Sequence, residues 1–395
     1  MKILMLTPYL PYPLHSGGQI RSYNLIKNLS QKHQITLFSF IRSKQEKKHT
    51  AELKKYCTKV TVFKRRQAWD PRNILISALT PYPFLVSIYL SKQIKNAIRQ
   101  ELTKNYDLIH AETFYVMPNL PKPTNIPTLL VEQTIEYMVY QRFVEDFKFF
   151  FLKPLLYFDV LKIKLWEKYF WQKATRLAAM SQSDKQIMVT SVKDRKVDVV
   201  ANGVDIQYFA KSNQSSSLPQ TILFVGNFKW LPNKDAAKFL ATDIWPKIHQ
   251  TLPQAQLWIV GRNPTQEILN LSNQANVTVS GQVNDIREAF KKASVLLAPI
   301  RNGRGTKYKV LEAMASQVPV VTTKLGIEGI AAVNQSSVMI AETADSLANK
   351  TIQVLTDRNL AQKLASNGKK LVYNQYNWQV ISKELDQIYQ QLGGA

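Results

Sequence analysis

One pattern constrains the fold of this chain more than any other. Short apolar runs alternate with amphipathic, helix-like stretches along most of the 395 residues. The runs are continuously apolar, which indicates strands that are covered on both faces. Strands that alternate with helices pair in parallel to form a doubly wound sheet, which binds ligands at the carboxyl ends of its strands. We therefore expect an α/β protein with its binding groups in loops that follow strands.

The alternation occurs in two blocks, and a chain of this length exceeds one ordinary core. Between the blocks, residues 201–220 are polar and rich in Ser and Asn, which predicts an interdomain linker. We expect Rossmann-like domains over residues 1–203 and 204–375, and a terminal segment over 376–395. The expected strands are Lys2–Thr7, Gln34–Ile41, Lys59–Phe63, Asp107–Ala111, Thr128–Val131, Arg176–Ala179, Val197–Val200, Thr221–Gly226, Gln256–Val260, Val277–Ser280, Val295–Pro299, Pro319–Thr322 and Val338–Ala341.

A basic, glycine-containing loop in the second block is the strongest candidate site. Residues 299–315 (PIRNGRGTKYKVLEAMA) follow a buried strand and enter a helix at about Tyr308. A helix N-terminus attracts anions, and glycine allows close backbone approach. The candidate groups are Arg301, Gly303, Arg304, Gly305, Lys307, Lys309 and Glu312. Cations beside one carboxylate suit a diphosphate joined to a polyol, as in a nucleotide sugar, although Glu312 could also simply balance charge.

Two further strand–loop–helix connections carry glycine. Gly17 and Gly18 follow the first strand, and we interpret them as a loop that faces a ligand; a simple connection is the alternative. Gly226 and Asn227 end the first strand of the second block and precede Lys229 and Lys234, which contact phosphate or merely line a solvated turn.

One histidine has a favourable location. His110 ends a predicted strand (DLIHAE), where we expect it to point into the ligand crevice with Glu112. The imidazole could bind a sugar hydroxyl, and Glu112 or Glu132 could act as a base toward an acceptor. A structural histidine is the alternative.

The sequence offers little for a metal or a disulfide. It contains no D-x-D and no H-E-x-x-H, and its one cysteine, Cys57, excludes an internal disulfide. Fixed Lys and Arg cations would then neutralise a leaving diphosphate, so we expect no metal cofactor.

The formal charge of +24 implies anionic partners. Residues 142–176 interleave lysines with bulky aromatic residues, which suits the interface of an anionic membrane; the core face of two helices is the alternative. Neither a secretory signal, a membrane-spanning run nor a nucleic-acid module is recognisable. We expect a cytoplasmic protein that is peripheral on the inner face of the cytoplasmic membrane.

Several segments together resemble the retaining glycosyltransferases of family 4, which have the GT-B fold. They are KILMLTPYLPYPLHSGGQIRSYNL, DLIHAE, RLAAMSQSDKQIM, VVANGVDIQYF, FVGNFKW, WIVGR, SGQVNDI and LLAPIRNGRGTKYKVLEAMASQVPVVTT, in the family's order. The resemblance implies an N-terminal acceptor domain and a C-terminal nucleotide-sugar domain that face each other across a cleft. It also implies that the last helix, about Trp378–Leu392, returns to the first domain. Gly261 and Thr306 join the donor-binding candidates on this ground.

The resemblance also implies roles for particular residues. Glu312 matches the second carboxylate of the family's E-x₇-E motif, which contacts the ribose, whereas Arg304 replaces the first. Residues 305–314 instead match a variant found with surface-polysaccharide clusters. Family members retain the anomeric configuration without a protein nucleophile, and His110, Glu112 and Arg304 are the catalytic candidates.

The expected activity is transfer of a sugar from a nucleotide-diphosphate sugar to a lipid-linked or polysaccharide acceptor in bacterial surface-glycan synthesis. A GT-B nucleotide-sugar epimerase and a non-catalytic nucleotide-sugar-binding assembly protein remain as alternatives.

Overall fold

A computed structural model describes residues 1–121, 124–192, 194–210, 220–303 and 305–393. The chain divides into two compact units, Met1–Ala201 with Ile381–Ala395, and Asn202–Val380. The expected boundaries lay at residues 203 and 375, within a few residues of these. Within the described residues, no helix is both long and apolar enough to cross a bilayer.

Unit 1 is built on a seven-stranded, fully parallel sheet of order β3-β2-β1-β4-β5-β6-β7. Its strands are β1 (Lys2–Thr7), β2 (Gln34–Ile41), β3 (Lys59–Lys64), β4 (Leu108–Glu112), β5 (Thr128–Glu132), β6 (Arg176–Ala179) and β7 (Val197–Val199). Its helices are α1 (Gly17–Leu29), η1 (Lys44–His49), α2 (Thr50–Leu53), α3 (Pro71–Leu79), α4 (Phe84–Tyr89), α5 (Lys92–Leu102), η2 (Phe114–Asn119), α6 (Glu136–Glu145), η3 (Phe150–Leu152), α7 (Lys153–Lys173) and α8 (Gln182–Val189).

Unit 2 contains a second parallel sheet, of order β10-β9-β8-β11-β12-β13. Its strands are β8 (Thr221–Asn227), β9 (Gln256–Arg262), β10 (Val277–Ser280), β11 (Val295–Ala298), β12 (Val320–Thr322) and β13 (Met339–Ile340). Its helices are α9 (Ile206–Ala210), α10 (Leu231–Phe239), the π-helical turn η4 (Leu240–Ile244), α11 (Trp245–Thr251), α12 (Gln266–Leu269), η5 (Asn270–Asn273), α13 (Ile286–Lys292), α14 (Tyr308–Ala315), η6 (Leu325–Ile327), α15 (Ala344–Thr356) and α16 (Arg358–Gln375). A last helix, α17 (Trp378–Gly393), begins in unit 2 and continues into unit 1 from Ile381.

The two doubly wound sheets confirm the predicted fold class, and every expected strand is present with small shifts at its ends. In both units the strand order reverses beside the first strand, between β1 and β4 and between β8 and β11. These reversals are the positions at which doubly wound sheets bind ligands.

The prediction of an interdomain linker over residues 201–220 is wrong for the first half of that segment. Val204 bridges to Asn377, and α9 follows with Ile206 and Phe209 buried. Ile206 and Phe209 are three positions apart, so they can pack on the same side of a helical turn. Their burial favours a helix within an otherwise polar segment. The rest of the predicted linker, residues 211–219, lies outside the described residues.

Local sequence signals explain where several helices begin. The Ser16 hydroxyl accepts a hydrogen bond from the Gln19 amide at the start of α1, and the Asp70 carboxylate accepts one from Arg72 before α3. Such side chains satisfy amides that have no partner within the helix.

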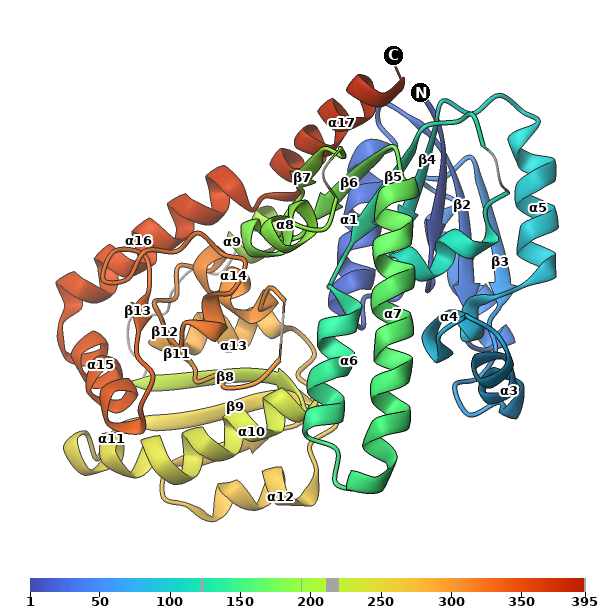
Figure 1. The fold of residues 1–395 in the computed structure, drawn as a ribbon. Helices are drawn as coiled ribbons and strands as arrows, with labels where there is room; N and C mark the ends of the chain where they lie inside the picture. The colour runs from blue at the N-terminus through green and yellow to red at the C-terminus, as the bar shows by residue number, and fades with distance from the viewer. Residues whose placement is uncertain (122–123, 193, 211–219, 304, 394–395) are drawn as a thin grey trace. The chain divides into compact units, whose positions relative to one another are not determined.

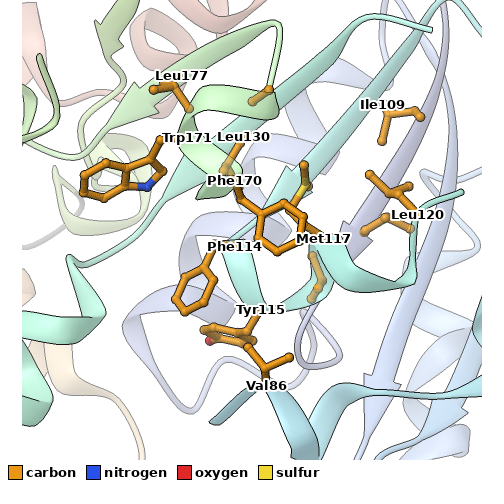
Figure 2. Packing of buried hydrophobic residues seen from close by; sticks show 14 of the residues in the cluster. Val86, Ile109, Phe114, Tyr115, Met117, Leu120, Leu130, Phe170, Trp171 and Leu177 are labelled. Carbon is orange, nitrogen blue, oxygen red and sulfur yellow. The ribbon is translucent and has the colours of Figure 1, made fainter. Parts of the chain in front are cut away.

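The unit 1 core packs helices against the central strands of the sheet (Figure 1). Figure 2 shows Phe114 and Tyr115 of η2 close to Val86 of α4, with Phe170 of α7 beside them. Full burial of such a side chain contributes about 1.5–3 kcal/mol. This packing anchors α7 to the sheet by its C-terminal half.

Candidate functional site

The basic loop of residues 299–307 leaves the sheet of unit 2 at its reversal point. It connects β11 to α14, and β11 lies directly beside β8, whose own loop opens α10. The loops after these two strands therefore meet at one edge of the sheet. The helix begins at Tyr308, as the sequence predicts, so its N-terminal end faces this loop.

The ammonium group of Lys307 is hydrogen-bonded to carbonyls of its own loop. Its Nζ donates to the Gly305 carbonyl at 2.6 Å and to the Gly303 carbonyl at 3.4 Å, and it lies 3.8 Å from Oε2 of Glu328. The same Glu328 oxygen accepts the Gly305 amide at 3.0 Å. Lys307 is thus a structural cation as well as a source of positive charge. No local pattern in the sequence points to Glu328, because it is 23 positions from Gly305.

Two glycines give this loop its shape. Gly303 and Gly305 have φ angles of +92° and +85°, in the left-handed region that other residues enter at a cost of about 1–2 kcal/mol. A Cβ on Gly303 would also lie 2.9 Å from Pro232, whereas one on Gly305 would meet open space. Nearby, the hydroxyl of Thr306 is buried and has no hydrogen-bond partner among the described residues.

Lys309 and Glu312 share the first turns of α14. Lys309 Nζ donates to Oδ1 of Asn233 at 2.8 Å and lies 4.3 Å from the centre of the Phe224 ring. Burial and the nearby Lys307 lower the pKa of Lys309 to about 7, against the opposing effect of Glu312. Burial raises the pKa of Glu312 to about 7, although Lys309 acts in the other direction. Both side chains remain partly accessible, so they can respond to a ligand.

Arg301 is not the free cation that the sequence suggests. Its guanidinium makes hydrogen bonds of 2.6 and 3.2 Å to Asp235 of α10 and stacks on Phe239, 4.0 Å from the ring centre. The pair ties the loop to α10, and Asp235 neutralises the charge. Arg304, the other predicted arginine, lies outside the described residues.

The loop after β8 is ordered by asparagines. Asn227 accepts the Lys229 amide at 3.1 Å and the Asn263 amide group at 3.2 Å through its side-chain oxygen. Its carbonyl accepts Nδ2 of Asn233 at 2.9 Å. Asn233 therefore joins this loop to Lys309, a role that no spacing in the sequence indicated.

Other predicted donor-binding residues fall into two groups. The ammonium groups of Lys229 and Lys234 contact no acceptor among the described residues, and they are available to a ligand. Gly261 pairs with Gly226 across β8 and β9, and a Cβ on Gly261 would lie 1.6 Å from the Gly226 carbonyl oxygen. Close strand packing, rather than ligand approach, explains Gly261.

His110 and Glu112 of unit 1 form a closed network instead of projecting into a crevice. Both are 0% exposed. The imidazole Nδ1 contacts the Tyr389 hydroxyl, and Nε2 lies 3.1 Å from Oε1 of Glu112. Their predicted orientation toward an open crevice is therefore wrong, because both side chains are buried and the Tyr389 hydroxyl of α17 contacts the imidazole.

The remaining partners of Glu112 complete this network. Gln133 Nε2 donates to Oε2 of Glu112 at 2.7 Å, and Arg21 Nε lies 3.9 Å from Oε1. Burial alone would raise the pKa of Glu112, but His110 and Arg21 outweigh it, so the pKa is lowered. The catalytic assignment of His110, Glu112 and Arg304 stays a prediction.

The predicted glycine loop of unit 1 adjoins this network. Gly17 opens α1, and a Cβ on Gly18 would lie 1.7 Å from the Tyr9 hydroxyl, which donates to Gln133 Oε1. Packing thus accounts for Gly18. In the described part of the chain, no cluster of three or more His, Cys, Asp or Glu side chains is placed to hold a metal ion.

Comparison with known proteins identifies two family models. The model described as Glycosyltransferase Family 4 matches residues 15–208, and the model described as Glycosyl transferases group 1 matches residues 219–357. Between them they span most of both units. The second match contains the whole basic loop and α14.

Three curated relatives show how far the similarity extends. Phosphatidyl-myo-inositol mannosyltransferase of Mycobacterium tuberculosis is 28% identical over 213 residues, which are 50% of this chain and 54% of that protein. The capsular polysaccharide biosynthesis glycosyltransferase CapM of Staphylococcus aureus is 26% identical over 258 residues (59% and 66%). The UDP-Gal:alpha-D-GlcNAc-diphosphoundecaprenol alpha-1,3-galactosyltransferase of Escherichia coli is 25% identical over 234 residues (54% and 59%). The chain thus matches about half the length of the mannosyltransferase relatives.

A solved structure covers the whole chain. Sucrose-phosphate synthase from Thermosynechococcus elongatus has a TM-score of 0.73 and 18% identity, with 100% of both chains covered. At this identity the likeness concerns the fold alone.

Proposed function

Because the chain belongs to glycosyltransferase family 4 and has the GT-B fold, we propose that it transfers a sugar from a nucleotide-diphosphate sugar to a lipid-linked or polysaccharide acceptor. The product belongs to bacterial cell-surface glycan synthesis. One observation carries the proposal: the strand–loop–helix at the reversal point of unit 2 combines the N-terminal end of α14, lysines and Glu312.

The donor binds with its diphosphate against this loop. The amides at the start of α14 and the Lys309 ammonium face the phosphates, while Lys229 and Lys234 add charge from the loop after β8. Glu312 accepts hydrogen bonds from ribose hydroxyls. A bound diphosphate raises the pKa of Lys309, because an adjacent anion favours the protonated amine.

The transfer retains the anomeric configuration and uses no metal. The bond from the anomeric carbon to the diphosphate breaks as the acceptor oxygen bonds to that carbon on the same face. The acceptor proton passes to the departing diphosphate, and fixed protein cations and amides stabilise the negative charge. The lysines and backbone amides of the described loops supply such cations and donors.

The acceptor lies at the anionic inner face of the cytoplasmic membrane. Two relatives act on lipid-linked acceptors according to their names. Residues 149–152 supply a surface for such a membrane, since Phe149, Phe150 and Phe151 are all more than half exposed. Aromatic residues beside lysines suit the bilayer interface.

The first test is a thermal-shift panel of nucleoside diphosphates and nucleotide sugars. A ligand that binds only the folded state raises the melting temperature. We expect a rise with one base, lost in Glu312→Gln and retained in Glu288→Gln, a control at an exposed position of the same unit. No shift at millimolar concentration would overturn the donor site.

The second test adds acceptors extracted from bacterial membranes to the donor so identified. Release of the free nucleoside diphosphate that depends on the acceptor supports transfer. A changed donor sugar without transfer would point to an epimerase, and binding without turnover to a non-catalytic role.

A further inference from the structure

An apolar groove opens on unit 1 between the end of α3 and one face of α7. Its volume is about 770 Å³, within the range of about 300–1,000 Å³ that small-molecule sites occupy. Leu79 lines one wall, and Phe158, Leu161, Leu165 and Tyr169 line the other. The α7 residues recur every three or four positions, so they share one helix face.

Two polar side chains in the walls of the groove are already hydrogen-bonded. Lys162 Nζ donates to the carbonyls of Ser77 and Thr80, at 2.5 and 2.9 Å, and Trp166 Nε1 donates to the Pro81 carbonyl at 2.7 Å. These bonds hold the two walls together. An occupant of this groove consequently meets hydrocarbon and aromatic surface.

The groove continues into an exposed apolar face. Leu165 and Leu161 are 60% and 49% exposed, and Leu155 is 68% exposed further along the same helix. The face ends at residues 149–152, where Phe150 is 80% exposed. Figure 1 shows this tip at the end of the paired helices α6 and α7. Apolar patches of this kind mark interaction sites.

We propose that this groove holds an acyl chain of an anionic phospholipid while residues 149–152 insert into the membrane interface. The inference rests on the membrane association in the proposed function and extends it to a specific lipid-binding site. It assigns the bilayer, rather than a protein, as the partner of this face.

Charge favours the lipid. Lys148 and Lys153 bracket the four apolar residues of the tip, and lysines near an anionic surface favour binding to it. Two acids of α7 are engaged internally: Asp159 accepts the Ser77 hydroxyl and the Phe84 amide, and Glu167 accepts the amides of residues 136 and 137. Protein–protein interfaces, by contrast, are depleted in lysine.

The test uses the full chain and vesicles of phosphatidylcholine and phosphatidylglycerol, the latter carrying a photoactivatable group in one acyl chain. After irradiation, mass spectrometry maps the cross-links. We expect them in residues 78–81 and 158–169. Cross-links confined to residues 149–155, with vesicle binding intact, would overturn the assignment of the groove as an acyl-chain site and indicate surface contact alone.

A variant that fills the groove tests the contribution of the groove apart from that of the surrounding exposed face. Ala78 lines the groove and is exposed, so Ala78→Trp fills it without removing apolar surface. We expect this variant to float with vesicles but to lose the groove cross-links. The matched control is Ala51→Trp, at an exposed helical position outside the groove, which should keep them. Equal labelling of the two variants would contradict the proposal.

Two further measurements on the same samples separate the possible failures. Nucleotide-sugar binding is followed by thermal shift, so loss of the donor site is seen independently of the lipid result. Light scattering without vesicles reports self-association; a dimer that protects the groove from labelling would identify a second copy as the occupant and overturn the lipid assignment.

Discussion

Lys309 and Glu312 lie one helical turn apart on α14, and their pKa values reach about 7 from opposite directions. Burial disfavours the charged form of each side chain, so it lowers the pKa of Lys309 and raises the pKa of Glu312. In the proposed donor complex, a diphosphate would restore the charge of Lys309, and a sugar hydroxyl would stabilise that of Glu312. We therefore expect the charge of both side chains to change when the proposed donor binds.

Glu312→Gln should weaken binding of the nucleotide sugar about tenfold to a hundredfold. A hydrogen bond to a charged group contributes about 1.5–3 kcal/mol, and the amide replaces one acceptor oxygen with a donor. Isothermal titration against Glu288→Gln measures the loss. Unchanged affinity would remove Glu312 from the donor site.

Donor affinity should follow a bell-shaped pH profile centred near pH 7. Protonated Lys309 is lost as the pH rises through its pKa of about 7, and ionised Glu312 is lost as the pH falls through its own. Lys309→Arg should remove the alkaline decline, because the guanidinium stays charged. An identical decline in the arginine variant would exclude Lys309 as its source.

Gly305→Ala should distort the basic loop and lower the melting temperature of unit 2 by several degrees. A positive φ costs alanine about 1–2 kcal/mol, and each kcal/mol shifts the melting temperature of a unit this size by about 2–4 °C. Gly281→Ala is the matched control, since a Cβ there also meets open space but the backbone is unstrained. Calorimetry that found equal effects would refute the conformational explanation.

Tyr389→Phe should destabilise unit 1 by about 1–3 kcal/mol. It leaves the buried His110 Nδ1 without its partner. Denaturant unfolding of this variant is compared with Tyr373→Phe, which alters an exposed tyrosine of α16 and should be neutral. A neutral Tyr389→Phe would show that the contact contributes nothing to stability.

The sequence predicted the elements and the basic loop well, and the partners of individual side chains poorly. The start of α14 at Tyr308 was predictable because a buried strand, glycines and an amphipathic run follow one another locally. Arg301 was misjudged because its partner Asp235 lies 66 positions away. His110 was misjudged for the same reason, since α17 reaches it from 279 positions along the chain.

Apolar periodicity and glycine placement, read in the sequence alone, determined the two parallel sheets and the loop at residues 299–307, and the ordered segments carried the resemblance to family 4. These features are local, because hydrophobic pattern and backbone preference act within a few residues. Only the tertiary structure decided which of the described cations pair with acids, that His110 and Glu112 are buried together with Tyr389 against the imidazole, and that α3 and α7 leave an apolar groove. Burial and ion pairing depend on residues brought together from distant parts of the chain, and those contacts set the charge and access of each side chain.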